Sequence, residues 1–149
     1  MFTLSLRTPV VAGVLALALA ACAEMNKEMG EEASLYDRLG GKEAIVAVVD
    51  DFVANVAADD RINGFFANTD IAHLKAMLVD QVCAASGGPC VYSGKDMKSA
   101  HAGMQITEEQ FNAMGEDMLK TLQTFQVPER ETNEVMTLLG SMQGDIIGQ

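Results

Sequence analysis

Basic side chains are scarce in this sequence. Ten lysines and arginines stand against 21 aspartates and glutamates, which gives a formal net charge of −11 at pH 7. Proteins that bind the phosphate backbone of nucleic acids present a basic face, so this composition argues against a nucleic acid partner. The excess of acidic residues otherwise indicates only good solubility.

Side chains that bind metals or form disulfides are also few, since the chain has three cysteines and two histidines. Cys83 and Cys90 lie seven positions apart rather than as Cys-x-x-Cys, and no second pair accompanies them, which argues against a zinc site. The third cysteine, Cys22, lies near the N-terminus. His73 and His101 are the only imidazole donors.

Sustained alternation of apolar and polar residues, internal repeats and low-complexity tracts are all absent from the sequence. Several segments instead space their apolar residues as a helix does. The length of 149 residues suggests one domain, and 49% apolar with 21% charged residues is typical of a globular chain. The sequence therefore predicts an all-α domain of about six helices, over residues 34–39, 42–56, 70–85, 95–103, 107–125 and from 128 onward.

The apolar stripes predict which side of each helix is buried. Thr107 to Gln110 has the form of a capping box, and Pro128 suits the first position of the last helix. Because the link between the last two helices is short, we expect them to pair antiparallel. The stripes expected to face inward are Ile45, Val48, Val49, Phe52 and Val56, then Leu74, Met77, Leu78, Gln81 and Val82, and in the last helix Val135, Leu138, Leu139 and Met142.

The first 21 residues have the features of a secretory signal peptide. Arg7 is their only charged residue, and an apolar run from Pro9 to Leu19 follows it. The run is short for a membrane span, although an uncleaved anchor is the alternative. The next residues, Leu19-Ala20-Ala21-Cys22, resemble the lipobox of bacterial lipoproteins. That resemblance implies that Cys22 is acylated and holds the protein at a membrane surface.

The lipobox resemblance also implies a location. Ala23 rather than aspartate follows the cysteine, a pattern that permits transfer to the outer membrane in Gram-negative lipoproteins. We expect an exported protein that faces the periplasm, with a signal peptide over 1–21, an acidic tether over 22–33 and a folded domain over 34–149. In an exported chain Cys83 and Cys90 are expected to form a disulfide, the alternative being two buried free thiols.

The folded domain resembles the group I truncated haemoglobins, and the resemblance covers almost all of it. It implies a two-over-two helical sandwich around haem b. The absence of Cys-x-x-Cys-His means that no covalent c-type attachment is expected. The residues that carry the resemblance are Ser34 to Gly41, Phe52, Asp59 to Ile62, Phe65, Phe66, Asp70, Gly87, Gly88, Tyr92, Gly94, Met97, Ala100 and His101.

The resemblance implies that His101 is the proximal ligand of the haem iron. Haem iron needs an axial donor, commonly histidine, and the chain has only two. His101 lies between Met97 and Met104, apolar neighbours that suit a helix face packed on porphyrin. The alternative for such a histidine is a hydrogen-bonded residue of the core.

Three further positions match haem contacts of the family. Phe66 corresponds to a phenylalanine that stacks on haem, and its alternative is a plain core aromatic. Lys95 and His73 correspond to positions that often carry a basic residue able to pair with a haem propionate. For these two, an ordinary solvent-facing residue is the alternative.

On the distal side the sequence departs from the family. Val53 replaces the tyrosine that usually follows Phe52 and donates a hydrogen bond to the bound gas. Leu74 and Leu78 match distal-helix positions, and Met77 lies where some members carry an iron-binding histidine. The predicted pocket is therefore largely apolar.

Two side chains leave alternatives open in this pocket. Gln81 is the only polar residue of its stripe and could donate to the bound gas, or it could pack past the haem edge. Met77 could complete a His/Met haem as in cytochromes, or it could be an ordinary packing residue.

These features predict reversible binding of O₂, NO or CO at the cell envelope. The first alternative is a redox, electron-transfer or gas-sensing haem protein, suggested by Met77 and by the pair Cys83 and Cys90. The second is an NO-detoxifying dioxygenase, which an apolar pocket disfavours because oxygen has to be held there. The third is a haem-free lipoprotein with a structural role. Any turnover needs an external reductase or electron donor, because the sequence contains no sign of a reductase domain.

Overall fold

The computed structural model describes residues 32–149. The expected signal peptide, Cys22 and most of the expected tether lie outside this range. Among the described residues, no helix is long and apolar enough to cross a membrane. Residues 33–149 form one compact unit, and the following description concerns this unit.

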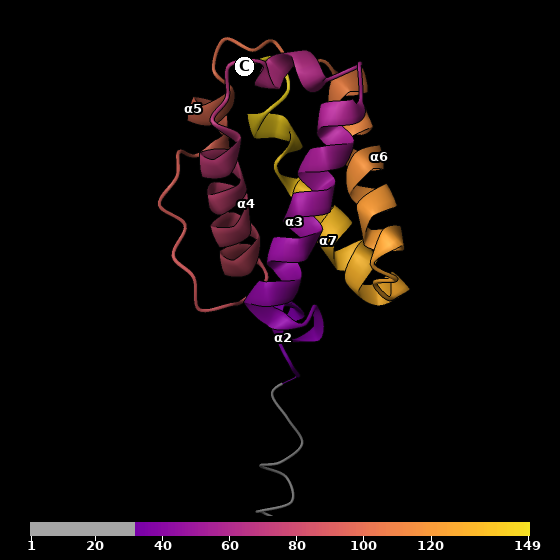
Figure 1. Ribbon diagram of the computed structural model, residues 1–149. Coiled ribbons are helices and arrows are strands. Elements are labelled where there is room, and N and C mark those ends of the chain that lie inside the picture. The colour runs from indigo at the N-terminus through magenta and orange to yellow at the C-terminus, as the bar shows by residue number, and fades with distance from the viewer. Residues whose placement is uncertain (1–31) are drawn as a thin grey trace, which may run out of the picture. The chain divides into compact units, whose positions relative to one another are not determined.

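The unit is helical, and its longer helices form two packed pairs. α3 packs against both α4 and α6, and α6 packs against α7 (Figure 1). The only β-type pairing within residues 32–149 is a single bridge between Ile106 and Ile147. In chain order the elements are α2 (Leu35–Arg38), α3 (Gly41–Ala58), η1 (Asn63–Phe66), α4 (Ile71–Ala85), α5 (Met97–His101), α6 (Glu108–Thr124), α7 (Glu129–Ser141) and η2 (Gln143–Asp145).

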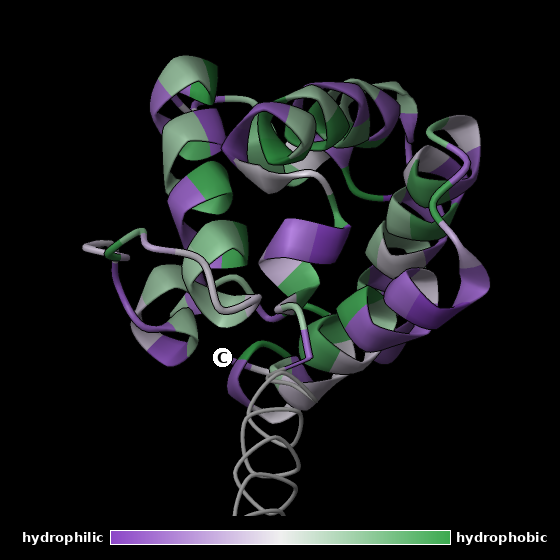
Figure 2. Ribbon diagram, turned by 90° about the horizontal axis from the view of Figure 1, so that it is seen from below, coloured by the Kyte–Doolittle hydropathy of each residue, from purple (hydrophilic) through white to green (hydrophobic). Residues whose placement is uncertain are grey.

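Each long helix carries apolar and polar residues on different sides (Figure 2), so burial of the apolar sides holds the pairs together. α3 is central and gives the largest share of the core, which also draws on α4 and α6. The buried core consists of Ile45, Val49, Phe52, Val53, Val56, Ile62, Val79, Cys83, Ala113, Met118 and Leu122.

Local sequence signals set the starts of several helices. The Thr107 hydroxyl accepts from the Gln110 amide at 3.3 Å, and the Gln110 side chain accepts from the Thr107 amide at 3.0 Å. The predicted capping box is therefore confirmed. The Asp70 carboxylate accepts from the His73 amide at 3.1 Å and starts α4 in the same way. Pro128 lies one position before α7 begins.

The short helix α5 differs from its predicted range of 95–103. It begins only after Asp96, whose carboxylate accepts from the Ser99 amide at 2.9 Å. It ends at His101 because Ala102 leaves the helical region, with φ −55° and ψ 125°. The periodic spacing of Met97, His101 and Met104 therefore continues beyond the helix itself.

The expected burial of the α7 stripe is met only in part: Val135, Leu138, Leu139 and Met142 are half-buried, and Val135 and Leu139 pack against the core. Within residues 32–149 the main neighbours of α7 are α6, α2 and η2.

The buried residue of α7 is instead Glu131. Arg38 donates from Nε to its carboxylate at 2.8 Å and also pairs with Glu134. The Arg38 guanidinium holds the pKa of Glu131 below its usual range. The charge of Glu131 is thus compensated where α2 meets α7.

Candidate functional site

One ring nitrogen of His101 is hydrogen-bonded to the main chain. Its Nδ1 lies 2.7 Å from the main-chain oxygen of Met97, one helical turn earlier. A carbonyl oxygen only accepts hydrogen bonds, so this contact requires the proton on Nδ1, and in the neutral imidazole that leaves the lone pair on Nε2. Within residues 32–149 no hydrogen bond engages Nε2. The half-buried imidazole is therefore in the tautomer that a metal ligand needs.

One face of α4 is turned toward α5. The Gln81 amide nitrogen lies 3.3 Å from the sulfur of Met97 at the start of α5. Leu74, Met77 and Leu78 share the helical face of Gln81, because they lie seven, four and three positions before it. The fold thus brings the predicted distal residues and the helix of His101 together.

The core face of α4 adjoins this one, and Leu78 packs against the core as well. Val79 and Cys83 are the buried residues of this helix, whereas Leu74, Met77 and Leu78 are only half-buried. Apolar side chains that the protein itself leaves partly uncovered are typical of a surface that packs on an apolar ligand. This face of α4 therefore suits one side of a flat apolar group.

The Gln81 side chain is directed at sulfur atoms. Besides Met97, its amide nitrogen lies 3.5 Å from the sulfur of Met142 at the end of α7. Thioethers are weak acceptors, but the two contacts place the amide where α4, α5 and α7 meet. This arrangement favours the packing role of Gln81 over the role of distal donor.

Val53 and Phe66 both belong to the apolar interior. Val53 is 7% exposed and lies in the core, on the helix that packs against α4. Phe66 is half-buried at the end of η1 and packs against the same core. A valine at this position offers no hydroxyl, so its side chain cannot donate a hydrogen bond.

The two candidate basic residues are exposed. The His73 amide donates to Asp70, the cap of α4, and the Lys95 main-chain oxygen accepts from the Tyr92 hydroxyl at 2.7 Å. In the described part of the chain neither side chain forms an ion pair with a carboxylate. Both remain available for an anionic group such as a propionate.

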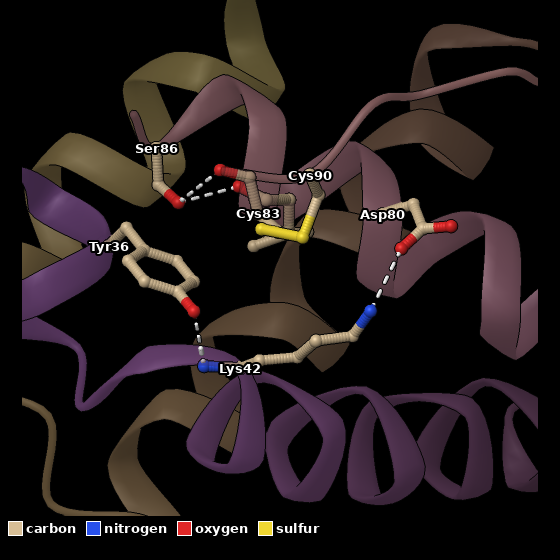
Figure 3. Close-up of a disulfide and its surroundings, with 7 residues drawn as sticks. Tyr36, Lys42, Asp80, Cys83, Ser86 and Cys90 are labelled. Atoms are coloured by element: carbon tan, nitrogen blue, oxygen red, sulfur yellow. Dashed lines mark hydrogen bonds and ion pairs between the residues drawn. A yellow bond between two sulfur atoms is a disulfide. The ribbon is translucent and has the colours of Figure 1, made fainter. Parts of the chain in front are cut away.

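A disulfide begins the connection from α4 to α5 (Figure 3). Cys83 and Cys90 are joined with a Cα–Cα distance of 5.7 Å, and Cys83 is completely buried. A Cβ on Gly88 would lie 2.7 Å from the Cys83 sulfur and 2.5 Å from the Tyr36 ring, so only glycine fits there. The Tyr36 amide donates to the Ser86 main-chain oxygen at 2.9 Å, which ties α2 to the same turn.

Comparison with known proteins identifies the fold. The profile of the bacterial-like globin family matches residues 34–147. The chain belongs to the bacterial-like globins. It is 36% identical over 116 residues to a group 1 truncated haemoglobin of Mycolicibacterium paratuberculosis, covering 78% of this chain and 85% of that one. A group 1 truncated haemoglobin of Tetrahymena pyriformis is 34% identical, over 81% of this globin and all of the relative.

Solved structures agree with this assignment. The crystal structure of the Tetrahymena pyriformis truncated haemoglobin in its Fe(III) form matches with a TM-score of 0.76 at 34% identity, over 78% of this chain and 100% of that one. The 2/2 haemoglobin from Synechococcus sp. PCC 7002, with covalently attached haem, matches with a TM-score of 0.73 at 37% identity, over 77% of this chain and 98% of that one. The predicted two-over-two truncated globin fold is confirmed.

Membership of this family implies haem-based gas binding, and the residues present fit a haem. His101 would supply an imidazole donor, and the half-buried faces of α4 and α5 would supply apolar walls. Sequence reasoning missed the part that Met142 plays. It is the partner of Gln81 although it lies 61 positions away, and no local pattern indicates such a contact.

Proposed function

We propose that this globin holds a haem b through Nε2 of His101 and reversibly binds O₂, NO or CO on the α4 side. The observation that carries the proposal is the 2.7 Å contact between Nδ1 of His101 and the Met97 main-chain oxygen. It orients the imidazole and makes the second nitrogen the donor. When bound, the haem would supply a ferrous iron able to take up a diatomic gas.

The chain's own residues make the distal side apolar. Val53, Leu74 and Leu78 exclude water and offer no side-chain hydrogen-bond donor. Such a pocket favours gases that bind ferrous iron strongly without a hydrogen bond, above all NO and CO. A sustained NO dioxygenase activity is disfavoured, because that reaction requires oxygen to be retained until NO arrives.

The test is the absorption spectrum of the protein purified from a haem-replete host, recorded ferric, ferrous and with CO. We expect a Soret band, a haem content near one per chain and a shift of the band on addition of CO. A folded preparation that neither contains haem nor takes it up on titration would contradict the proposal. That result would favour the haem-free alternative.

A second function, electron transfer at a His/Met haem, is favoured by the position of Met77 on the α4 face that is turned toward α5. The ferrous spectrum without added ligand separates the two functions. Gas binding predicts a five-coordinate spectrum that Met77→Leu leaves unchanged. Electron transfer predicts a six-coordinate low-spin spectrum that the same substitution abolishes.

We further infer export and anchoring at the periplasmic side of the outer membrane through acylated Cys22. The inference is supported by the Leu19-Ala20-Ala21-Cys22 sequence after a short apolar run, and by the Cys83–Cys90 disulfide, which suits an oxidising compartment. Electrons for any turnover would come from an external donor.

A further inference from the structure

α5 is too short to hold His101 in place by itself. It has five residues, and helices of this length do not persist without tertiary contacts. Asp96 caps its start, but the chain leaves helical geometry at Ala102, directly after His101. The position of the imidazole therefore depends on what holds the chain beyond the helix.

The turn that follows His101 requires unusual backbone conformations. The Met104 amide donates to the main-chain oxygen of His101 at 3.0 Å, so the turn includes the histidine itself. Gly103 has a φ of 82° and Gln105 a φ of 51°, both in the left-handed region. Glycine adopts this region freely, but glutamine does so only where other contacts stabilise it.

Those contacts come from residues 146–149, which we call the C-terminal strap. The Gln105 amide donates to the main-chain oxygen of Gln149 at 2.8 Å, and the Gly148 amide donates to that of Ile106 at 3.0 Å. The Gln105 side-chain amide also donates to Gln149 at 3.0 Å. Figure 1 shows the C-terminus beside α5.

The strap is itself anchored at its origin. Ile146 is 4% exposed, and η2, which precedes it, packs against α5. The side-chain amide nitrogen of Gln81 contacts two sulfur atoms, that of Met97 at the start of α5 and that of Met142 just before η2. The start of α5, through Gln81, and the turn after His101 are therefore both linked to the chain segment that follows α7.

We propose that the C-terminal strap is a positioning element for His101. By fixing the turn at Gln105 it sets the orientation of the imidazole, whose Nδ1 is bonded to Met97 and whose Nε2 would hold the haem iron. The proposal rests on the proposed role of His101 as the haem ligand. Loosening the strap would let the ring tilt and weaken the axial bond, in the way that losing an outer-shell partner weakens other metal sites.

The test compares two residues with nearly the same backbone conformation. Gln126 has a φ of 53° but lies in the link between α6 and α7, at the far end of the unit from α5 in Figure 1. Valine disfavours the left-handed region at either position. We expect Gln105→Val to speed haem loss to an excess of apo-globin by roughly tenfold or more and to shift the Fe–His stretching band of the ferrous protein. Gln126→Val should leave the rate of haem loss and the Fe–His band as in the wild type. The two substitutions should lower the melting temperature alike.

Gln105→Gly keeps the backbone conformation and loses only the side-chain bond, so it should stay close to the wild type. In haem-loaded protein lacking residues 147–149, amide hydrogen exchange should accelerate over 102–106 and remain unchanged in α3 and α6. If the shortened chain does not fold, the point variants decide. Wild-type haem loss and Fe–His frequency in Gln105→Val, or equal changes in Gln126→Val, would overturn the proposal. A wild type without a Soret band would instead overturn the proposed function.

Discussion

Asp117 places a carboxyl group where solvent does not reach one of its oxygens. The residue is 7% exposed, and its Oδ2 has no hydrogen-bond partner within the described part of the chain. Loss of solvation raises its pKa, and the charges of Asp59 and Glu116 act in the same direction, against those of Lys120 and Arg61. The folded protein therefore keeps this proton to a higher pH than the unfolded chain does.

The pH dependence of stability follows from the sign of that shift. The proton on Asp117 stabilises the folded state. Its contribution to the free energy of unfolding is fully present below the ordinary pKa of aspartate, and it is lost as the pH rises through the raised pKa of the folded protein. We expect Asp117→Asn, which cannot ionise, to lack the fall in unfolding free energy that the wild type shows over this range. Urea unfolding at a series of pH values measures it, with Glu43→Gln as an exposed control. Parallel curves for wild type and Asp117→Asn would refute this explanation.

In the proposed pocket, Val53 is the residue that decides whether a bound gas meets a hydrogen-bond donor from α3. Val53→Tyr should restore a hydroxyl on the core side of α3 and slow oxygen dissociation by about tenfold to a hundredfold, since a hydrogen bond to a partly charged acceptor contributes roughly 1.5–3 kcal/mol. Stopped-flow displacement of oxygen measures the rate. Val53→Phe matches the added volume without the hydroxyl, so an equal slowing in both variants would point to bulk rather than bonding.

Among the elements, the connection from α4 to α5 depends most on a covalent tie. Replacing both Cys83 and Cys90 by alanine should lower the free energy of unfolding by about 2.5 kcal/mol through the freed loop entropy. Urea unfolding measures the loss, and an unchanged midpoint and slope would contradict the expectation. The same variant separates two functions, because redox sensing requires altered gas-binding kinetics whereas a purely structural disulfide leaves them as in the wild type.

The helices could be predicted from the sequence because their signals are local. Periodic spacing located the long helices, and Thr107 with Gln110 marked the start of α6. The end of α5 could not be predicted in this way, since the chain leaves helical geometry at Ala102 and the turn that follows is bonded to Gln149, 44 positions further along the chain from Gln105. The α7 stripe is less deeply buried than expected, because periodicity gives the apolar side of a helix but not how completely its neighbours cover it.

The sequence predicted the residues of the site better than the contacts between them, because those contacts are not local. The candidate role of His101 came from the resemblance to truncated haemoglobins together with the scarcity of histidine. Its bond to Met97 spans one helical turn, so the spacing of the two residues permits it without requiring it. The two partners of Gln81 lie 16 and 61 positions away, beyond any pattern that a single sequence contains.

At the scale of the whole molecule, the proposed anchor decides where the globin acts. Cys22 lies outside the described residues, and its acylation is a proposal from the sequence. We expect the protein to incorporate labelled palmitate and to fractionate with the outer membrane, and Cys22→Ala to do neither. The variant with alanine at positions 83 and 90 should keep the label. Incorporation by Cys22→Ala would show that acylation occurs elsewhere, and an unlabelled wild type would exclude a lipoprotein.

The central claim is that His101 ties the haem to this fold, and replacing its side chain by a diffusible imidazole tests it most directly. His101→Gly should lose the Soret band of the wild type and release haem readily, and added imidazole should restore the wild-type spectrum by filling the vacated space. His73→Gly should keep the wild-type spectrum throughout. A His101→Gly protein with an unchanged spectrum in the absence of imidazole would contradict the account.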